Sequence, residues 1–145
     1  MSTTLSGQVI GQAHHATRAL LERELTGIGL TFAQSLALNA VAAEGGAAVR
    51  SALVRRLTGV LKVDESTVAT TLAELIDAGL LRALPADGPG LAFTDLGRER
   101  HRLIADATGA IVARLYADIP AEDAAATARV LTLLTRRADA ELAQG

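Results

Sequence analysis

The segment at residues 63–81, VDESTVATTLAELIDAGLL, constrains the fold more than any other part of the chain. Apolar side chains recur along it at three- and four-residue steps, which predicts an amphipathic helix with one buried face. Asp64 or Ser66 can cap the first turn of this helix, and Gly79 is placed as its C-terminal residue. The apolar face holds Val68, Leu72, Leu75, Ile76 and Leu80, and the opposite face holds Ser66, Thr67, Thr70, Thr71 and Glu74. The helix therefore needs a core on one side and presents hydroxyl groups on the other.

The segments around this helix predict a helix-turn-helix followed by a hairpin. Residues 51–61 have leucines at four-residue spacing, which predicts a short helix joined by a turn to the next one. Residues 80–84 and 91–93 predict two short strands around a tight turn. A long helix follows from about residue 96 to residue 117. This order of elements is typical of a winged helix-turn-helix.

Further helices complete the predicted fold. Apolar periodicity predicts a helix over residues 8–27. The next helix starts after Thr31, whose hydroxyl can accept an N–H, with Gln34 placed three residues later as in a capping box. Its expected buried face consists of Phe32, Leu36 and either Ala40 or Val41. Pro120 starts the last helix, which reaches about residue 142. The fold class is mainly α with a small two-stranded wing, in a single domain covering residues 1–145.

The composition excludes several classes of protein. The chain has no cysteine, so disulfides, thiolate metal sites and catalytic cysteines are excluded. His14 and His15 are adjacent and point roughly 100° apart on a helix, so we expect no metal site. There is no nucleophile elbow or phosphate-binding loop, and we expect neither an enzyme nor a cofactor. Without a signal peptide or a run of about 18 apolar residues, the chain is expected to be cytoplasmic, with no membrane partner.

Three segments carry a resemblance to a known family. LTFAQSLAL at residues 30–38 contains a Leu-Thr-x-x-Gln-x-x-x-Leu pattern, and residues 57–81 contain Val-Asp-x-Ser-Thr-Val and end in Leu-x-x-x-Gly-Leu-Leu. FTDLGRER at residues 93–100 is similar to a Leu-Thr-x-x-Gly-Arg segment that follows a wing. In this order and at these separations, the chain resembles the MarR family of bacterial transcription regulators over nearly its whole length.

The resemblance implies a homodimer that binds DNA. Residues 30–95 would form the winged helix-turn-helix, and residues 5–29 and 96–145 would form the helical dimerisation part. The dimer would read a pseudo-palindromic operator with half-sites about one helical turn apart, usually as a repressor. The flanking helices carry apolar residues beyond what a small winged domain can cover, so we expect a partner to cover them; examples are Ile111, Leu115, Leu131 and Leu134.

The resemblance also implies a small effector, often phenolic or otherwise lipophilic, bound between the dimerisation helices and the winged part. Binding of such a ligand usually relieves repression in the family. The resemblance makes His14 or His15, together with Arg18, candidates for lining this ligand site.

The candidate DNA-binding surface departs from the family pattern in its charge. The family often has basic residues at the positions of Thr70 and Glu74, and a basic wing tip where this chain has Gly88, Pro89 and Gly90. The net charge of the chain is −2. The remaining candidates are hydroxyls that can contact phosphates or base edges, and basic residues that can contact phosphates. The hydroxyls are Ser66, Thr67, Thr70 and Thr71, and the basic residues are Arg55, Arg56, Lys62 and Arg82.

The same departures support an alternative interpretation. A winged-helix dimer that has weak DNA binding, or none, would serve as a ligand-binding or protein-interaction module. Both alternatives predict the same fold, so the choice between them depends on the exposed face of the helix at residues 63–81.

Overall fold

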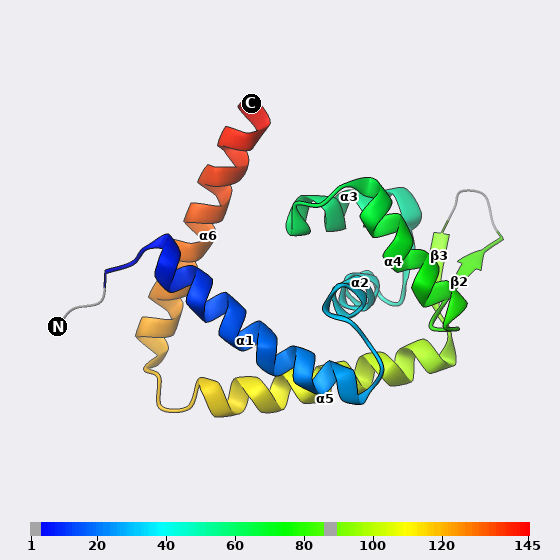
Figure 1. The fold of residues 1–145 in the computed structure, drawn as a ribbon, viewed down its shortest axis with the longest axis horizontal. Helices are drawn as coiled ribbons and strands as arrows, with labels where there is room; N and C mark the ends of the chain where they lie inside the picture. Colours follow the sequence, from blue (N-terminus) through cyan, green and yellow to red (C-terminus); the bar gives the residue numbers. More distant parts are fainter. Residues whose placement is uncertain (1–3, 86–89) are drawn as a thin grey trace. The chain divides into compact units, whose positions relative to one another are not determined.

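The computed structural model describes residues 4–85 and 90–145, which form six helices and three short strands (Figure 1). The chain divides into two compact units, one reaching Ile111 and one from Val112 to Gly145. This mainly helical fold with a small antiparallel sheet confirms the predicted fold class. The elements are α1 (Gly7–Gly27), α2 (Phe32–Ala43), β1 (Ala47–Val49), α3 (Arg50–Leu61), α4 (Glu65–Asp77), β2 (Leu81–Leu84), β3 (Gly90–Phe93), α5 (Asp95–Leu115) and α6 (Ala121–Gln144).

Side-chain caps determine where the central helices begin. The predicted capping box of α2 is confirmed: Thr31 Oγ1 accepts from the Gln34 N–H at 3.1 Å, and the Thr31 N–H donates to Gln34 Oε1 at 3.0 Å. Of the two predicted caps of α4, Asp64 is the one that the structure uses. Thr94 Oγ1 accepts from the Gly97 N–H at 2.9 Å at the start of α5, and the same hydroxyl donates to the Gly79 carbonyl at 2.6 Å.

The sheet has three strands in the order β1-β3-β2, with both pairings antiparallel. The predicted hairpin partners are present, with Leu81 opposite Phe93. The strand β1 was not predicted, because Ala-Ala-Val is too short to show an alternating pattern and alanine has a low strand propensity. The turn that the sequence predicts between β2 and β3 includes residues 86–89, which lie outside the described residues.

The helix α2 is the centre of the first unit. It contacts α1, α3, α4, β1 and β3, and Figure 1 shows it end-on beside α3 and α4. The prediction for its buried face is wrong in part, because Phe32 and Leu36 are only half-buried while Val41 and Ala40 are buried. Neighbours on several sides bury its small residues instead, which allows close helix packing. The buried residues of α2 are Ser35, Ala37, Leu38, Ala40 and Val41.

The start of α5 is seated against the end of the helix-turn-helix. A Cβ atom built on Gly97 would lie 2.0 Å from the Leu80 carbonyl oxygen, so only glycine fits this approach. The ring of His101 lies 5.6 Å from that of Phe93, and its Nε2 is 3.0 Å from Asn39 Oδ1. These contacts connect α5 to β3 and α2.

The second unit contains α6, which has no buried residue. Its apolar residues Val130, Leu131, Leu133 and Leu134 are 36–41% exposed. Leu115, near the end of α5, is 40% exposed, whereas Ile111 is only 7% exposed. The expectation that Ile111 needs a partner is therefore wrong, because this chain already buries it.

Two further properties concern membranes and metals. Among the described residues, no single helix has both the length and the apolar character to cross a membrane, and only α1 and α2 together, bent by 87°, meet those criteria. Within the same residues, no group of three or more His, Asp or Glu side chains is arranged to hold a metal ion.

Candidate nucleic-acid interface and the adjoining pocket

One stripe of α4 faces solvent along the whole helix. Ser66, Thr70, Ala73 and Asp77 follow one another at steps of four, three and four residues, which places them on one side of a helix. All four are exposed, whereas Val68, Leu72 and Leu75 on the opposite side are buried. We call these four exposed residues the outer stripe. A helix-turn-helix presents an exposed side of its second helix to a DNA groove, which makes the outer stripe the candidate surface for DNA.

Thr71 does not belong to this surface, although the sequence predicts it on the polar face of the helix. It is only 9% exposed, and its hydroxyl donates to the Thr67 carbonyl at 3.2 Å. Its position explains the difference, because Thr71 lies three residues after Val68 and four before Leu75, on the buried side. Its expected placement on the exposed face is therefore wrong.

The first turn of α4 is organised around the Asp64 carboxylate. Asp64 Oδ1 accepts from the Thr67 N–H at 2.9 Å and from the Thr67 hydroxyl at 2.6 Å. The Ser66 hydroxyl donates to the same oxygen at 3.1 Å. Helix N-termini attract anions, so a carboxylate at this place competes with a DNA phosphate. The hydrogen bonds to Asp64 also hold the hydroxyls of Ser66 and Thr67 at the start of α4.

These hydrogen bonds lower the pKa of the Asp64 carboxyl below its usual value, with the Thr67 hydroxyl as the largest cause, followed by the Thr67 N–H and the Ser66 hydroxyl. A folded-state pKa below the unfolded one means that the charged group stabilises the fold. That stabilisation is complete above the unfolded pKa of about 3.9 and is lost as the pH falls through the lower folded value.

We expect Asp64→Ala to lower the free energy of unfolding at neutral pH, because the variant loses the cap of α4. The deficit relative to the unmodified chain should shrink as the pH falls through the lowered pKa, since the carboxylate is then protonated in both states. Urea unfolding from about pH 6 to about pH 2.5 measures this. Asp64→Asn, which keeps a cap but does not titrate, is the control. A deficit that stays constant over this range would contradict the prediction.

The four predicted basic contacts differ in their present partners. Arg56 forms an ion pair with Glu44 at 3.7 Å. Lys62 has a left-handed backbone with φ 57° at the end of α3, and its Nζ donates to the Gly59 carbonyl. Within the described part of the chain, neither Arg55 nor Arg82 forms an ion pair, and both are exposed. A contact with phosphates would therefore break no ion pair of Arg55 or Arg82 with a described residue.

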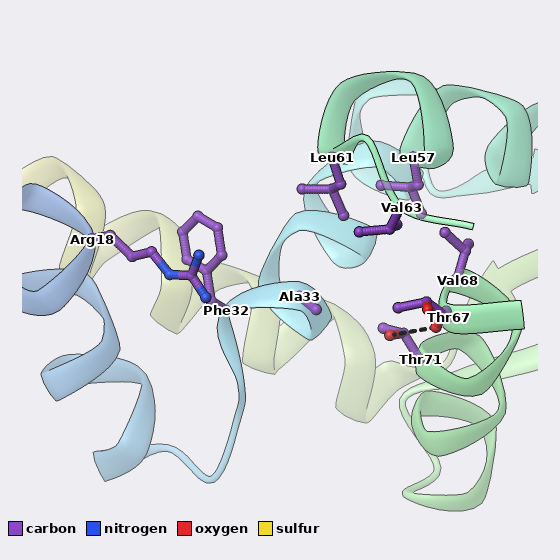
Figure 2. Close-up of a pocket in the computed structure, with 9 residues that line it drawn as sticks. All are labelled: Arg18, Phe32, Ala33, Leu57, Leu61, Val63, Thr67, Val68 and Thr71. Atoms are coloured by element: carbon purple, nitrogen blue, oxygen red, sulfur yellow. Dashed lines mark hydrogen bonds between the residues drawn. The ribbon is translucent and has the colours of Figure 1, made fainter. Parts of the chain in front are cut away.

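A pocket of about 180 Å³ lies against the inner side of the helix-turn-helix, within the first unit (Figure 2). In Figure 2, Arg18 and Phe32 lie at one end of it, and Thr67, Val68 and Thr71 of α4 lie at the other. Most of the lining is apolar, and the pocket touches α4 directly. The lining residues are Arg18, Phe32, Ala33, Leu57, Leu61, Val63, Thr67, Val68 and Thr71.

Of the three residues predicted to bind a ligand, one lines this pocket and two do not. Arg18 lines it, with its guanidinium carbon 4.2 Å from the centre of the Phe32 ring and its Nε 2.5 Å from Glu22 Oε1. His14 does not line it but lies edge-on to Phe32, with the ring centres 6.4 Å apart. His15 lies beside His14, at 5.3 Å between ring centres, and does not line the pocket. Phe32 was not predicted to line a ligand site, because its position in the first turn of α2 indicated a core residue.

The fold and the arrangement of α3, α4 and the sheet define a winged helix-turn-helix protein. The model of the MarR family matches residues 28–90, which include most of the winged helix-turn-helix part of the chain. No curated protein sequence matches the chain.

Solved structures show the same fold at low sequence identity. A MarR protein from Peptoclostridium difficile has a TM-score of 0.76 and 18% identity, over 97% of this chain and 96% of the other. A putative MarR family transcriptional regulator from Listeria monocytogenes, complexed with 26mer DNA, has a TM-score of 0.80 and 16% identity, over 96% and 92%. A mutant of E. coli MarR complexed with operator DNA has a TM-score of 0.73 and 20% identity, over 88% and 91%.

Proposed function

We propose that this protein is a transcription regulator that binds a pseudo-palindromic DNA operator as a homodimer and acts as a repressor. The outer stripe of α4 carries the proposal, because Ser66, Thr70, Ala73 and Asp77 form an exposed face on a helix-turn-helix frame. The family match at residues 28–90 agrees with a regulator rather than an enzyme. A protein with this role acts where the chromosome is, which makes a cytoplasmic location part of the proposal.

A gel shift with the intergenic DNA upstream of the gene tests the proposal at low and at moderate salt. A sequence-selective complex at low salt is expected, and it should weaken steeply with salt because phosphate contacts release counterions. If competitor DNA of unrelated sequence displaces the bound DNA equally well, the result would support the alternative, a winged-helix module without operator function. That alternative has its own support, since α4 carries Glu65, Glu74 and Asp77 but no Lys or Arg.

The exposed apolar residues of α6 support the homodimer. A helix with four neighbouring apolar residues at 36–41% exposure gains stability when a partner buries them. A two-fold dimer also provides the two recognition helices that a pseudo-palindrome requires.

We expect Leu131→Glu with Leu134→Glu to convert the dimer to monomer, because the change places two charges per protomer in an apolar contact. Sedimentation velocity of the dilute protein measures the change in mass. Ala125→Glu with Thr132→Glu, on the other side of α6, is the matched control and should remain dimeric. A dimer that survives the leucine substitutions would place the interface elsewhere.

The pocket supports the proposed response to a small effector. Its 180 Å³ are close to the roughly 150 Å³ of an apolar cavity known to bind benzene, so a ligand with one ring fits. Apolar walls suit the ring, and the guanidinium of Arg18 suits a carboxylate or phenolate at the edge. Since Thr67, Val68 and Thr71 line the pocket, a ligand there contacts α4, which is the recognition helix of the proposed regulator.

We expect benzoate, phenol and toluene to raise the thermal unfolding temperature, with about 2.7 kcal/mol of stabilisation at a ligand concentration of 100 times its Kd. Ala33→Leu should abolish the effect by filling the pocket, whereas Ala43→Leu, exposed on the same helix, should not. Arg18→Ala should weaken the response to benzoate more than the response to toluene. Equal responses in the Ala33 and Ala43 variants would exclude this pocket as the effector site.

A further inference from the structure

Every side-chain donor on the recognition helix already has an acceptor within the protein. The sequence of α4 contains no Lys, Arg, Asn, Gln, His or Trp, so its only side-chain donors are the hydroxyls of its serine and threonines. Ser66 and Thr67 donate to the Asp64 carboxylate at 3.1 and 2.6 Å. Thr70 donates to the Ser66 carbonyl at 3.0 Å, and Thr71 to the Thr67 carbonyl at 3.2 Å.

A hydroxyl that donates its one proton inside the helix still has lone pairs that can accept. The Ser66 and Thr70 oxygens on the outer stripe are therefore acceptors, as is the carboxylate of Asp77. The carboxylates of Glu65 and Glu74 are also exposed on α4, and Glu74 already accepts from Gln34 Nε2 at 3.3 Å. The polar part of this face consists of acceptors.

The edges of bases in the major groove differ in what they offer. Guanine presents two acceptors, O6 and N7, and thymine presents an acceptor and a methyl group. Cytosine presents its N4 amino group, and adenine presents its N6 amino group beside the acceptor N7, so the two amino groups are the donors. An acceptor face matches the amino groups and is mismatched with guanine. The methyl groups of Thr70 and Ala73 on the same stripe match the thymine methyl.

We infer that the outer stripe of α4 reads the amino groups of cytosine and adenine, with Ser66 and Thr70 as the specificity-determining acceptors, and that it does not read guanine. This inference rests on the proposed function and specifies the chemistry of its operator. The carboxylate of Asp64 keeps this preference in place, because it holds the Ser66 proton away from the DNA.

The test uses the full chain and DNA made with altered bases. Selection from a random duplex library first yields a bound site. Purine then replaces adenine, 2-pyrimidinone replaces cytosine, or 7-deazaguanine replaces guanine, one position at a time within the half-site. Removal of an amino group under α4 is expected to weaken binding about 5- to 150-fold, the range of one specific base contact. The deazaguanine substitutions are expected to change affinity by less than about twofold.

A variant separates base reading from a structural role of the hydroxyl. Thr70→Val keeps the size and the methyl group but removes the acceptor, so it should lose the preference for an amino group at one base pair while other positions keep theirs. Ala43→Val, exposed on α2, is the control and should leave every position unchanged.

The outcomes distinguish the inference from the proposed function. Selective binding that depends on guanine N7, or on neither kind of group, would overturn the inference and leave the regulator intact. Unchanged base preference in Thr70→Val would also overturn the assignment of Thr70. A library that yields no selected sequence would overturn the proposed function, and the inference with it.

Discussion

Gly97→Ala is expected to lower the free energy of unfolding by about 3 kcal/mol, at the upper end of what overpacking usually costs. The new Cβ would meet the Leu80 carbonyl oxygen at 2.0 Å and the Phe93 ring at 3.2 Å. That carbonyl cannot move freely, because it accepts from the Thr94 N–H at 3.1 Å. The midpoint of thermal unfolding, measured at constant protein concentration, should fall by about 10 °C.

Gly109→Ala provides the matched control on the same helix. Nothing lies within 4 Å of a Cβ built there, and alanine favours a helix interior over glycine by up to about 1 kcal/mol. This variant should therefore be as stable as the unmodified chain or slightly more stable. Equal stability of the two variants would mean that α5 is not seated on the Leu80 carbonyl.

Arg55→Ala with Arg82→Ala is expected to weaken DNA binding by two to three orders of magnitude at about 0.15 M salt. If each arginine meets one phosphate in each protomer, the dimer loses four contacts, and the slope of log K against log salt becomes shallower by about 4. Fluorescence anisotropy with the selected site, over a range of salt concentrations, measures both quantities.

Arg23→Ala with Arg102→Ala removes the same charge from exposed positions on α1 and α5 and is the control. Its affinity should fall far less, since these arginines lie outside the helix-turn-helix and the sheet. If both double variants change the slope equally, the effect comes from net charge, and Arg55 and Arg82 are not specific contacts.

The helices could be predicted from the sequence because burial imposes a 3.6-residue period on apolar side chains. The cap of α2 was also predictable, since Thr31 and Gln34 have the spacing of a capping box. The strand β1 was not, because its Ala-Ala-Val sequence becomes a strand only through pairing with β3, a long-range contact.

The candidate site was predictable in outline but not in its hydrogen bonding. Ser66 and Thr70 lie on the exposed face as expected, whereas Thr71 is buried. Threonine carries both a methyl group and a hydroxyl, so it can pack against apolar residues as well as face solvent, and here the hydroxyl of Thr71 donates within the helix. The hydrogen-bond partner of each hydroxyl depends on which acceptor the fold brings near it, and the local sequence does not determine that partner. The pocket residues come from four helices and from the turn between α3 and α4, and no local pattern could have brought Arg18 and Val68 to the same cavity.

The capping box of α2 limits which residues this fold tolerates at positions 34 and 74. A capping box usually accepts glutamate as readily as glutamine, because only a side-chain oxygen is required. Here the amide of Gln34 has two ends in use: its oxygen accepts from the Thr31 N–H, and its nitrogen donates to Glu74 Oε1 at 3.3 Å. A glutamate at position 34 would set two carboxylates against each other, so an acidic residue at position 74 favours glutamine over glutamate at position 34. A basic residue at 74 would permit glutamate at 34, and the pair thus links the start of α2 to the charge of the recognition helix.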